Sequence, residues 1–376
     1  MNNSSFWEAP TSNFDVVIIG AGFLGSWTAY ELAKNQHLSI AVIERSSLSR
    51  GASTKNAGFA CFGSATELLS DIQILGKEKA VEITEKRIQG IDKIRTILGD
   101  SSICYDACGG FEIFFENDQI PDNQQIENLN TLLQSQFDDI PFSFLTEEQI
   151  SALGFSLNVK AIITNPYEGS INPVKTLESL HTLLKSKGVQ IYFETAFASY
   201  NTENETVTMI SKGEQTFCKA KRVIYCTNAF TNHPDILPGR GQVFITTVIE
   251  SLQLRGTFHY DEGYVYLRNV QSQEGNRILI GGGRNKDFAT EQTTLFASNP
   301  KLLSYLEQIL KTIFPQNTSF SIEKTWSGIM GFSTSKLPIV TELNEKEFMG
   351  FACNGMGVAL TPIISEELAS IVADSL

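Results

Sequence analysis

The sequence predicts an α/β protein (α+β overall) in which a parallel central sheet is joined to an inserted, mixed or antiparallel sheet. An apolar β-branched run, a glycine-rich turn, a helical segment and a second apolar run follow one another within 14–45. This order is typical of the strand–helix–strand unit of a parallel sheet. After Pro238 the pattern changes to short alternating runs such as 241–254, which is typical of antiparallel strands. A strand, a glycine turn and a helix return at 348–373, so the second sheet interrupts the first domain.

The turn at 20–25 reads G-x-G-x-x-G and follows the apolar run 16–19. In such a turn Gly20 permits the tight bend, Gly22 lets the backbone approach a pyrophosphate, and Gly25 lets the helix pack against the strand. The helix N-terminus adds free N–H groups and a partial positive charge. Glu44 ends the second strand, where it can accept hydrogen bonds from ribose hydroxyls. Three glycines alone are weak support, but strand, helix and acid together predict a Rossmann-like dinucleotide site.

The remaining elements follow from periodicity and from helix start and stop residues. The small residues of 51–63 predict a loop pressed against a ligand, with a plain surface connection as the alternative. Pro173 in a first turn and Gly188 after a last turn delimit one helix. The predicted helices are 66–98 (two, separated at Gly76), 122–137, 146–153, 173–187, 300–314 and 363–373. The predicted strands are 109–116, 189–193, two within 200–218, 222–228, 241–254, 263–268, 277–281, 319–330 and 348–353.

These elements divide the chain into two interleaved domains. We expect residues 1–97, 168–238 and 326–376 to form the nucleotide-binding domain. Residues 98–167 and 239–325 are expected to form the domain that carries the substrate side.

Composition narrows the class of partner. The net charge of −13, from 29 basic and 42 acidic residues, disfavours nucleic acids and anionic membranes because both would be repelled. The six cysteines form no C-x-x-C pair, and Cys104-x-x-x-Cys108 lacks partners at metal-site spacing, so no metal is expected. The first 14 residues do not resemble a signal peptide, and no apolar run is long enough to span a membrane. We therefore expect a cytoplasmic protein.

Taken together, the motifs resemble the D-amino-acid oxidase type of FAD-dependent oxidoreductases, the group of glycine oxidase, sarcosine oxidase and γ-glutamylputrescine oxidase. The resemblance covers nearly the whole chain. It rests on GAGFLG at 20–25 with Glu44-Arg45, GASTKNAGF at 51–59, SINP at 170–173, Thr227-Asn228, GGGR at 281–284, Trp326-x-Gly328, and NGMG at 354–357.

The resemblance implies FAD and assigns its contacts. Sarcosine oxidases bind flavin through a cysteine, but the matching position here lies near Gly328, which implies noncovalent FAD. The first two strands and the loop after them would contribute Gly20, Gly22, Phe23, Leu24, Gly25, Glu44, Arg45, Ser53, Asn56, Ala57 and Gly58. Later segments would contribute Ala196 and Phe197 near the adenine, then Thr227, Asn228, Gly328, Asn354, Gly355, Met356, Gly357 and Val358.

The substrate end is less defined by sequence. Tyr264, Tyr266 and Arg268 alternate along a predicted strand and so share one face; an ordinary polar sheet face is an equal alternative. Arg284 follows three glycines, and either arginine can hold an acidic group bidentately.

Two further residues, Lys55 and Met330, are expected near the reactive end of FAD. Lys55 can polarise the flavin or oxygen, although a solvent-facing lysine is the simpler interpretation. Met330 stands where glycine oxidase carries its carboxylate-binding arginine, so that anchor is missing. His181 and His233 are expected on the surface, and Cys353 is expected to be a buried structural thiol beside the flavin contacts.

The leading hypothesis is oxidation of a C–N bond in a small amine or N-substituted amino acid by hydride transfer to FAD. An alternative is a 2-hydroxy-acid or polyol dehydrogenase, and another is a non-catalytic flavin-binding assembly protein. The expected partners are a small-molecule substrate and either oxygen or an unknown electron carrier, with a monomer or small homo-oligomer as the assembly. A tRNA-modifying role is disfavoured by the acidic charge and the absence of a basic patch.

Overall fold

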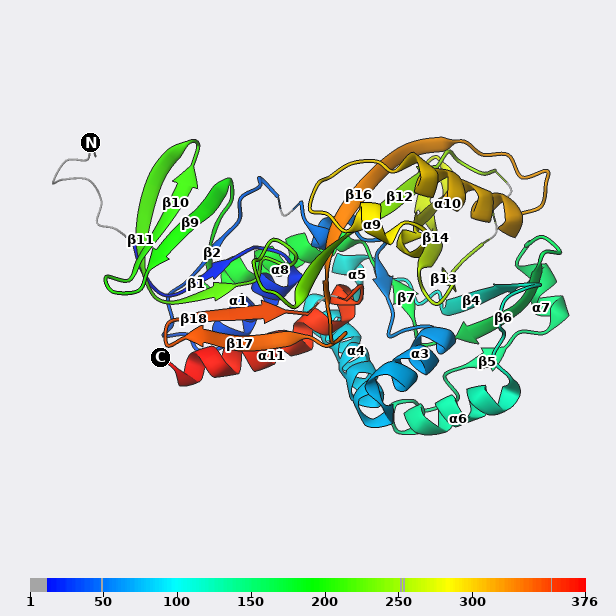
Figure 1. Cartoon of the computed structure of the whole chain (residues 1–376), viewed down its shortest axis with the longest axis horizontal. Coiled ribbons are helices and arrows are strands. Elements are labelled where there is room, and N and C mark those ends of the chain that lie inside the picture. The colour runs from blue at the N-terminus through cyan, green and yellow to red at the C-terminus, as the bar shows by residue number, and fades with distance from the viewer. Residues whose placement is uncertain (1–11, 49, 251, 253, 353) are drawn as a thin grey trace.

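The computed structural model describes residues 12–376 except 49, 251, 253 and 353. Two expectations therefore lie outside the described part: that Cys353 is a buried thiol, and that the first residues do not form a signal peptide. The molecule is elongated, with one sheet in each half and helices running beneath their junction (Figure 1). The two halves are built from interleaved segments of the chain.

The first sheet has the strand order β17-β18-β11-β1-β2-β8. Its parallel part consists of β18 (Glu347–Phe351), β11 (Glu214–Tyr225), β1 (Asn13–Ile19), β2 (Ile40–Ile43) and β8 (Gln190–Tyr192). The antiparallel additions are β17 (Ile339–Asn344), β10 (Thr206–Ser211) and β9 (Thr195–Asn201). The predicted parallel central sheet is confirmed.

Both faces of β1 are buried, which explains why its apolar run is continuous rather than alternating. Val16 and Ile18 pack with residues of helices α1 (Phe23–Leu32) and α11 (Gly357–Asp374). Val17 and Ile19 pack on the other side, against the ribbon formed by β9 and β10.

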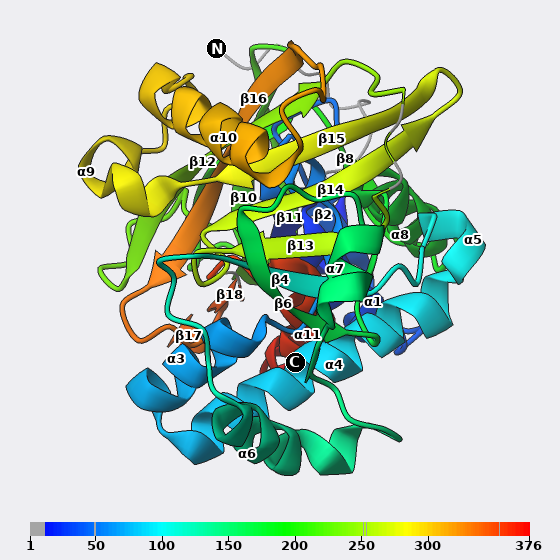
Figure 2. The same ribbon diagram turned by 90° about the vertical axis from the view of Figure 1, so that its right-hand side faces the viewer.

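The second sheet has the order β16-β12-β15-β14-β13-β4-β6-β5 and is mixed, because β13 and β4 run parallel while the other pairs run antiparallel. Its strands are β16 (Ile322–Ser333), β12 (Ile236–Thr246), β15 (Gly275–Gly282), β14 (Val265–Ser272), β13 (Thr257–Tyr260), β4 (Gly110–Phe115), β6 (Val159–Asn165) and β5 (Ser143–Phe144). Helix α10 (Pro300–Ile313) lies over β12 and β15 and completes this core (Figure 2).

The other described elements connect the two sheets or cover their edges. The helices are α2 (Ala52–Lys55), α3 (Ala65–Leu75), α4 (Lys77–Leu98), α5 (Asp100–Ile103), α6 (Asn123–Leu133), α7 (Glu147–Ala152), α8 (Pro173–Ser186) and α9 (Phe288–Glu291). Short 3₁₀ turns span Gln134–Gln136 and Arg284–Lys286, and β3 (Phe59–Ala60) pairs with β7 (Gly169–Ser170).

Several expected elements differ from the structure. The strand expected at 222–228 is continuous with the second strand expected within 200–218, and together they form β11. The last helix begins at Gly357 rather than 363, because Pro362 removes only one N–H and the helix is held by packing on α1 and α4. The strand expected at 241–254 is shifted to β12 at Ile236–Thr246. The boundary expected between 325 and 326 falls inside β16, so this strand belongs to the second sheet along its whole length.

Candidate active site

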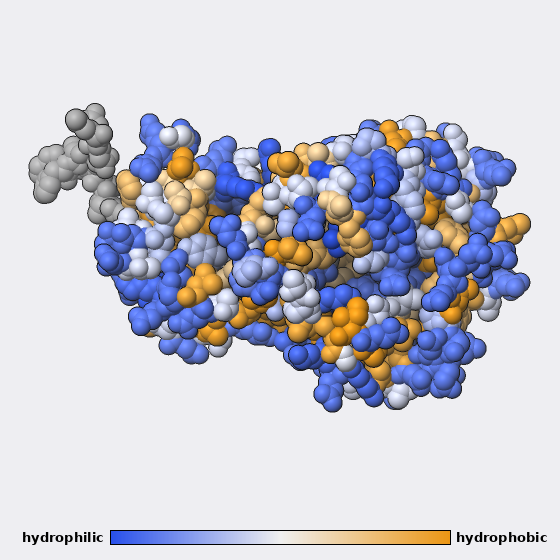
Figure 3. Space-filling model, in the orientation of Figure 1, coloured by the Kyte–Doolittle hydropathy of each residue, from blue (hydrophilic) through white to orange (hydrophobic). Residues whose placement is uncertain are grey.

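A cavity of about 1440 Å³ runs from the glycine turn of the first sheet to β14 and β16 of the second. This exceeds the roughly 300–1,000 Å³ of an ordinary small-ligand pocket and leaves room for a dinucleotide beside a small substrate. Hydrophobic surface patches lie where the two halves meet (Figure 3). Of the residues that the sequence assigns to FAD or to the substrate, all but Gly25, Gly58 and Arg268 line the cavity.

The glycine turn shows why side chains are excluded there. Gly20 has a φ of +107°, and a Cβ on it would lie 2.6 Å from the carbonyl oxygen of Cys226. A Cβ on Gly25 would lie 2.0 Å from the carbonyl oxygen of Gly20, so α1 contacts the turn directly. Gly25 thus acts behind the cavity wall, in the packing role that the motif predicts. The first turn of α1 opens into the cavity, with Gly22 and Phe23 in its lining.

Glu44 is fixed at the end of β2 by three donors. Its Oε2 accepts a hydrogen bond from the N–H of Ala21 at 3.2 Å. Its Oε1 accepts from the backbone N–H and the hydroxyl of Ser46, at 3.0 and 2.9 Å. These donors hold the carboxylate in the cavity wall at the end of the strand, a position suited to ribose hydroxyls.

The loop 51–58 folds over α1 and is held by its own polar groups. The Ser53 hydroxyl accepts a hydrogen bond from the N–H of Phe23 at 2.9 Å and so caps the first turn of α1. The Asn56 side chain donates to the carbonyls of Ala52 and Ser53 and accepts from the N–H of Gly58. The loop is therefore a preformed part of the wall rather than a plain surface connection.

Arg268 lies outside the cavity lining, behind this loop. Its Nη1 donates to the carbonyl oxygens of Ala57, Gly58 and Ile171 at 3.3, 2.9 and 3.0 Å. Gly58 leaves room for this contact, because a Cβ there would lie 2.9 Å from the same Nη1. Burial lowers the pKa of Arg268. The expectation that Arg268 shares a substrate-facing surface is corrected: it supports the loop from behind.

The opposite wall is formed by the start of α11. Residues 354–358 line the cavity, and Asn354 and Gly355 have φ values of 47° and 89°. The side chain of the N-cap residue, Met356, makes no capping hydrogen bond to the first N–H groups of the helix. The first N–H groups of α11 thus face the cavity, where they favour negative charge.

Two asparagines tie β16 to the first sheet beside this wall. Asn228 donates to the carbonyl of Ile329 and accepts from the N–H of Gly331, at 3.1 and 3.0 Å. The side-chain oxygen of Asn354 accepts from the N–H of Ser333 at 2.7 Å, and the N–H of Asn354 donates to the carbonyl of Gly331 at 3.1 Å. The positions of Gly328 and Met330 in the cavity follow from this connection.

Arg284 is the unpaired cation of the far end among the residues that the structure describes. Its guanidinium lies 3.7 Å from the ring centre of Phe332 and 4.8 Å from that of Phe288. No acidic group or carbonyl among those residues accepts a hydrogen bond from it. Burial lowers its pKa. A cation stacked between rings, with its edge free, is suited to binding an anion bidentately.

The tyrosines differ in their surroundings. Tyr266 lines the cavity with its ring edge-on to Phe59, and burial raises its pKa to about 12, so its hydroxyl stays protonated at neutral pH. Tyr264 is more exposed and packs edge-on against Phe288 at the rim. Tyr266 is therefore a hydrogen-bond donor inside the cavity, and Tyr264 part of its mouth.

Lys55 belongs to a row of alternating cations and rings that sequence reasoning missed. Arg45 lies 4.2 Å over the ring centre of Phe230, Phe230 stacks on Phe296 at 6.5 Å, and Lys55 lies 4.2 Å over Phe296. The ammonium of Lys55 also donates to the carbonyl of Ser327 at 3.3 Å. Burial and the charge of Arg50 lower the pKa of Lys55. Neither phenylalanine belongs to a motif, so nothing in the sequence pointed to this row.

A polar group at the far wall was also missed. Arg87 of α4 pairs through Nη2 with Asp71 at 3.2 Å and through Nη1 with Glu67 at 3.8 Å, and all three line the cavity. Burial raises the pKa of Glu67, although the charge of Arg87 opposes this. His259 of β13 lines the same wall. These residues come from separate elements, so only the folded chain brings them together.

His181 is buried, contrary to the expectation of a surface position. Its Nε2 lies 3.0 Å from the hydroxyl of Ser26 and 3.0 Å from the carbonyl oxygen of Ala21. Burial lowers its pKa. Because α8 packs on α1, this face of α8 supports the glycine turn from behind.

The described part of the chain contains no helix long and apolar enough to cross a membrane. No curated protein sequence matches the chain. Among solved structures, L-proline dehydrogenase from P. horikoshii is 17% identical, with a TM-score of 0.74 and coverage of 97% of this chain and 94% of that one. Glycine oxidase from Geobacillus kaustophilus is 19% identical, with a TM-score of 0.74 and coverage of 97% and 95%. L-α-glycerophosphate oxidase from Mycoplasma pneumoniae, with FAD bound, is 17% identical, with a TM-score of 0.71 and coverage of 96% and 95%.

At these identities the structural similarity establishes a shared fold. The family model described as FAD dependent oxidoreductase (DAO) goes further, because it matches residues 15–371. The cavity fits a dinucleotide, with glycines where a Cβ would collide and two helix N-termini facing inward. The chain therefore belongs to the DAO family and is an FAD-dependent oxidoreductase.

Proposed function

We propose that the protein oxidises the C–N bond of a small amine or amino acid, with or without an N-substituent, and that its preferred substrates carry a carboxylate. The observation that supports this most directly is the unpaired Arg284 in the cavity wall. Arg284 is half-buried, and a cation that is partly removed from water without an acidic partner is costly, so a substrate carboxylate would offset that cost.

The cavity lining suggests which residues hold FAD. Gly20, Gly22 and the start of α1 would bind the pyrophosphate, and Glu44 the ribose. Ala196 and Phe197 line the end nearest to β9, where the adenine would lie. The start of α11 and Gly328 would lie against the flavin ring. Residues 326–330 contain no cysteine, which supports noncovalent binding.

The chemistry that bound FAD would supply is that of a hydride acceptor for the substrate carbon. The protein's own contribution is orientation. Arg284 would hold the carboxylate, the protonated hydroxyl of Tyr266 would donate a second hydrogen bond, and Met330 would provide an apolar surface beside them. Fixing the substrate in this way replaces a bimolecular encounter by a positioned one. The uncapped start of α11 would stabilise negative charge that develops on the cofactor side.

An anaerobic substrate panel tests the proposal. The FAD-loaded protein is mixed with amino acids, with the corresponding amines that lack a carboxylate, and with 2-hydroxy acids, and loss of flavin colour is followed. We expect amino acids to bleach the flavin at the lowest concentrations. If no amine and no amino acid bleaches it, the proposal is wrong.

The variant Arg284→Met tests the anchor. Because charge-assisted hydrogen bonds of this kind contribute about 2–3 kcal/mol, half-maximal bleaching should need roughly 100-fold more amino acid, while an amine without a carboxylate should be unaffected. The control is Arg255→Met, which removes an exposed arginine paired with Asp106. An equal loss for both substrates would show that Arg284 does not hold the carboxylate.

A second candidate function is oxidation of a C–OH bond, as in a 2-hydroxy acid or a polyol phosphate. In terms of geometry, an arginine fork such as that of Arg284 would hold a phosphate as well as a carboxylate. The similarity in fold to a glycerophosphate oxidase supports including these compounds in the panel. Bleaching by hydroxy compounds alone would favour this function, and a flavin that no compound reduces would favour the non-catalytic role.

Several finer expectations belong to the same proposal. We propose that the division expected from the sequence holds, with 1–97, 168–238 and 326–376 as the FAD domain and 98–167 and 239–325 as the substrate domain, except that β12 and β16 belong whole to the substrate domain. We also propose that the protein works in the cytoplasm as a monomer or small homo-oligomer. Oxygen or an unidentified carrier would take the electrons from FAD. The acidic net charge of −13 supports the absence of nucleic-acid partners.

A further inference from the structure

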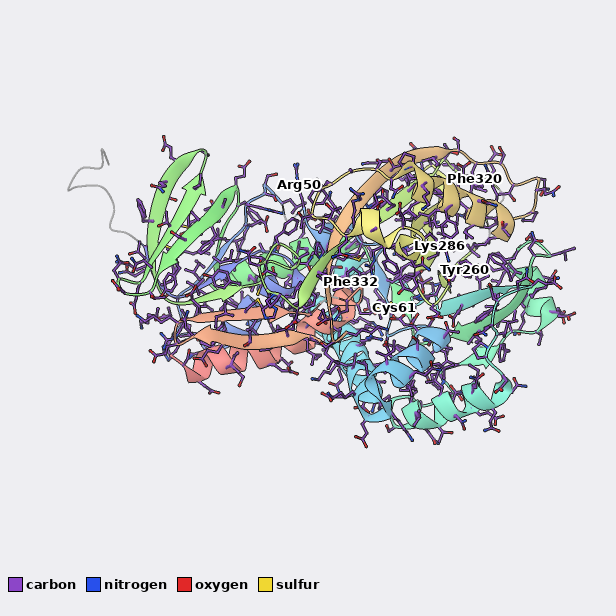
Figure 4. The ribbon with its side chains drawn as sticks, in the orientation of Figure 1. Arg50, Cys61, Tyr260, Lys286, Phe320 and Phe332 are labelled. Atoms are coloured by element: carbon purple, nitrogen blue, oxygen red, sulfur yellow. The ribbon has the colours of Figure 1, made fainter. Side chains whose placement is uncertain are left out.

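Three potential metal ligands from distant parts of the chain meet at the far wall of the cavity. Cys61 directly follows β3, Glu168 directly precedes β7, and His259 lies on β13. One ligand atom from each lies within 4.8 Å of the other two. All three side chains are buried, and Cys61 lies at the junction of the two halves (Figure 4). This arrangement is independent of the residues that would hold FAD or the substrate carboxylate.

The neighbours of Glu168 and His259 orient these side chains toward each other. Oε1 of Glu168 accepts hydrogen bonds from the N–H groups of Phe62 and Gly63, at 2.9 and 3.2 Å. Its Oε2 is left to face Nε2 of His259, at 3.5 Å. The imidazole is held edge-on by the ring of Phe59. Such outer contacts are what fix the first ligands of a metal site.

One ring nitrogen of His259 is left without a hydrogen bond at this point. Its Nε2 is buried and faces Oε2 of Glu168 in a long ion-pair contact of 3.5 Å, and it makes no regular hydrogen bond to the residues that the structure describes. Buried polar atoms without a partner are rare and call for an explanation. A cation between Nε2 and the two other ligands would supply the missing partner.

We propose that Cys61, Glu168 and His259 form a binding site for a divalent metal ion, with Zn²⁺ as the best match. Thiolate, imidazole and carboxylate are all Zn²⁺ ligands, and the mixed S, N, O set disfavours Mg²⁺ and Ca²⁺, which prefer oxygen alone. Ligand atoms about 2.0–2.3 Å from a tetrahedral ion lie roughly 3.3–3.8 Å apart, close to the separation of Glu168 and His259. A small inward movement of the side chains would complete the site.

The proposed site has an open side. Cys61 and His259 both line the cavity, whereas Glu168 does not. Three protein ligands therefore leave the fourth tetrahedral position directed at the cavity, for water or a donor atom of a bound molecule. Glu67 and Asp71 line the same wall but are paired with Arg87, so Cys61 and Glu168 themselves supply the negative charge that a cation would meet. Metal binding replaces the thiol proton of Cys61, which is released to the solvent.

Metal analysis of the FAD-loaded protein tests the site without an activity assay. After treatment with a chelator and dialysis, the protein is equilibrated with a small excess of Zn²⁺, freed of unbound metal and analysed for zinc per flavin. We expect one equivalent of zinc per chain. With Co²⁺ instead, we expect d–d absorption bands at wavelengths beyond those of the flavin, as a tetrahedral Co²⁺ site produces.

Two variants localise the metal. Cys61→Ser and His259→Gln each remove one of the three ligands, so each should weaken zinc binding by at least the roughly 10- to 100-fold that loss of an outer contact costs, and should shift or remove the cobalt bands. The matched controls are Cys218→Ser, a buried thiol in β11, and His37→Gln, which lies outside the site; both should keep one equivalent.

Flavin content and the thermal midpoint show whether each variant is folded. If a variant does not fold, the amount of zinc bound per wild-type chain still tests the proposal. Less than a tenth of an equivalent in the wild type would mean that Glu168 and His259 form only an ion pair, and would overturn the proposal. Full retention of zinc by both site variants would do the same.

Discussion

The two ends of the cavity are built in different ways. At the glycine-turn end, backbone N–H groups and glycines form the wall, and Gly20, Gly22, Glu44 and Ser53 are close together in the sequence. At the far end, side chains form the wall, and they come from α3, α4, β13, β14, β16 and the turn after β15. A site made of local backbone is encoded in a short motif, whereas a site made of side chains depends on the whole fold.

The largest expected effect tests the local end. Gly25→Ala would place a Cβ 2.0 Å from the carbonyl oxygen of Gly20, which is backbone and cannot move away cheaply. We expect no FAD to be retained and a loss of unfolding free energy of about 3 kcal/mol or more. Flavin content and urea unfolding measure both.

The matched control is Gly51→Ala, which also lies in the lining but whose Cβ would meet nothing within 4 Å. It should bind FAD like the wild type. If both variants behave alike, the close approach of α1 to the turn is not what limits FAD binding.

The next effect tests whether Arg268, from the second sheet, supports the loop 51–58 at the glycine-turn end of the cavity. Arg268→Met removes hydrogen bonds to three buried carbonyls of the loop and of the segment before α8. We expect about 2–3 kcal/mol less stability and weaker FAD binding, with the substrate dependence of the remaining activity unchanged. Urea unfolding and FAD titration provide the measurement, and Arg255→Met is the control. If Arg268→Met changes only the affinity for substrate, Arg268 contacts the substrate and does not merely support the loop.

The smallest effect concerns pH at the glycine turn. Burial lowers the pKa of His181, so the unfolded chain takes up a proton below pH about 6.5 that the folded chain resists. The stability contributed by neutral His181 is present above that pH and is lost as the pH falls. The melting temperature of the wild type should therefore drop by roughly 1–2 °C more than that of His181→Gln between pH 7.5 and about 5.5. Parallel curves for the two proteins would contradict this.

The same contrast explains what could be predicted from the sequence. The strand, turn and helix around Gly20 follow from local pattern, and so do the parallel sheet and the start of α8 at Pro173. The burial of His181 could not be predicted, because nothing on α8 itself shows that its polar face packs on the glycine turn. Arg268 was correctly placed on a strand, but its three carbonyl partners lie in two other segments. Phe230, Phe296 and His259 belong to no motif, and only tertiary structure brings them to the cavity.

The asparagine connection between β16 and the first sheet has a consequence for motion. Asn228 and Asn354 hold Ile329, Gly331 and Ser333, so the strand that completes the second sheet is fastened at its end to the first. A hinge opening of one half against the other would have to break these hydrogen bonds together. Substrate exchange should therefore proceed through local displacement of rim side chains such as Tyr264 and Phe288, while the distance between the two walls stays constant during turnover.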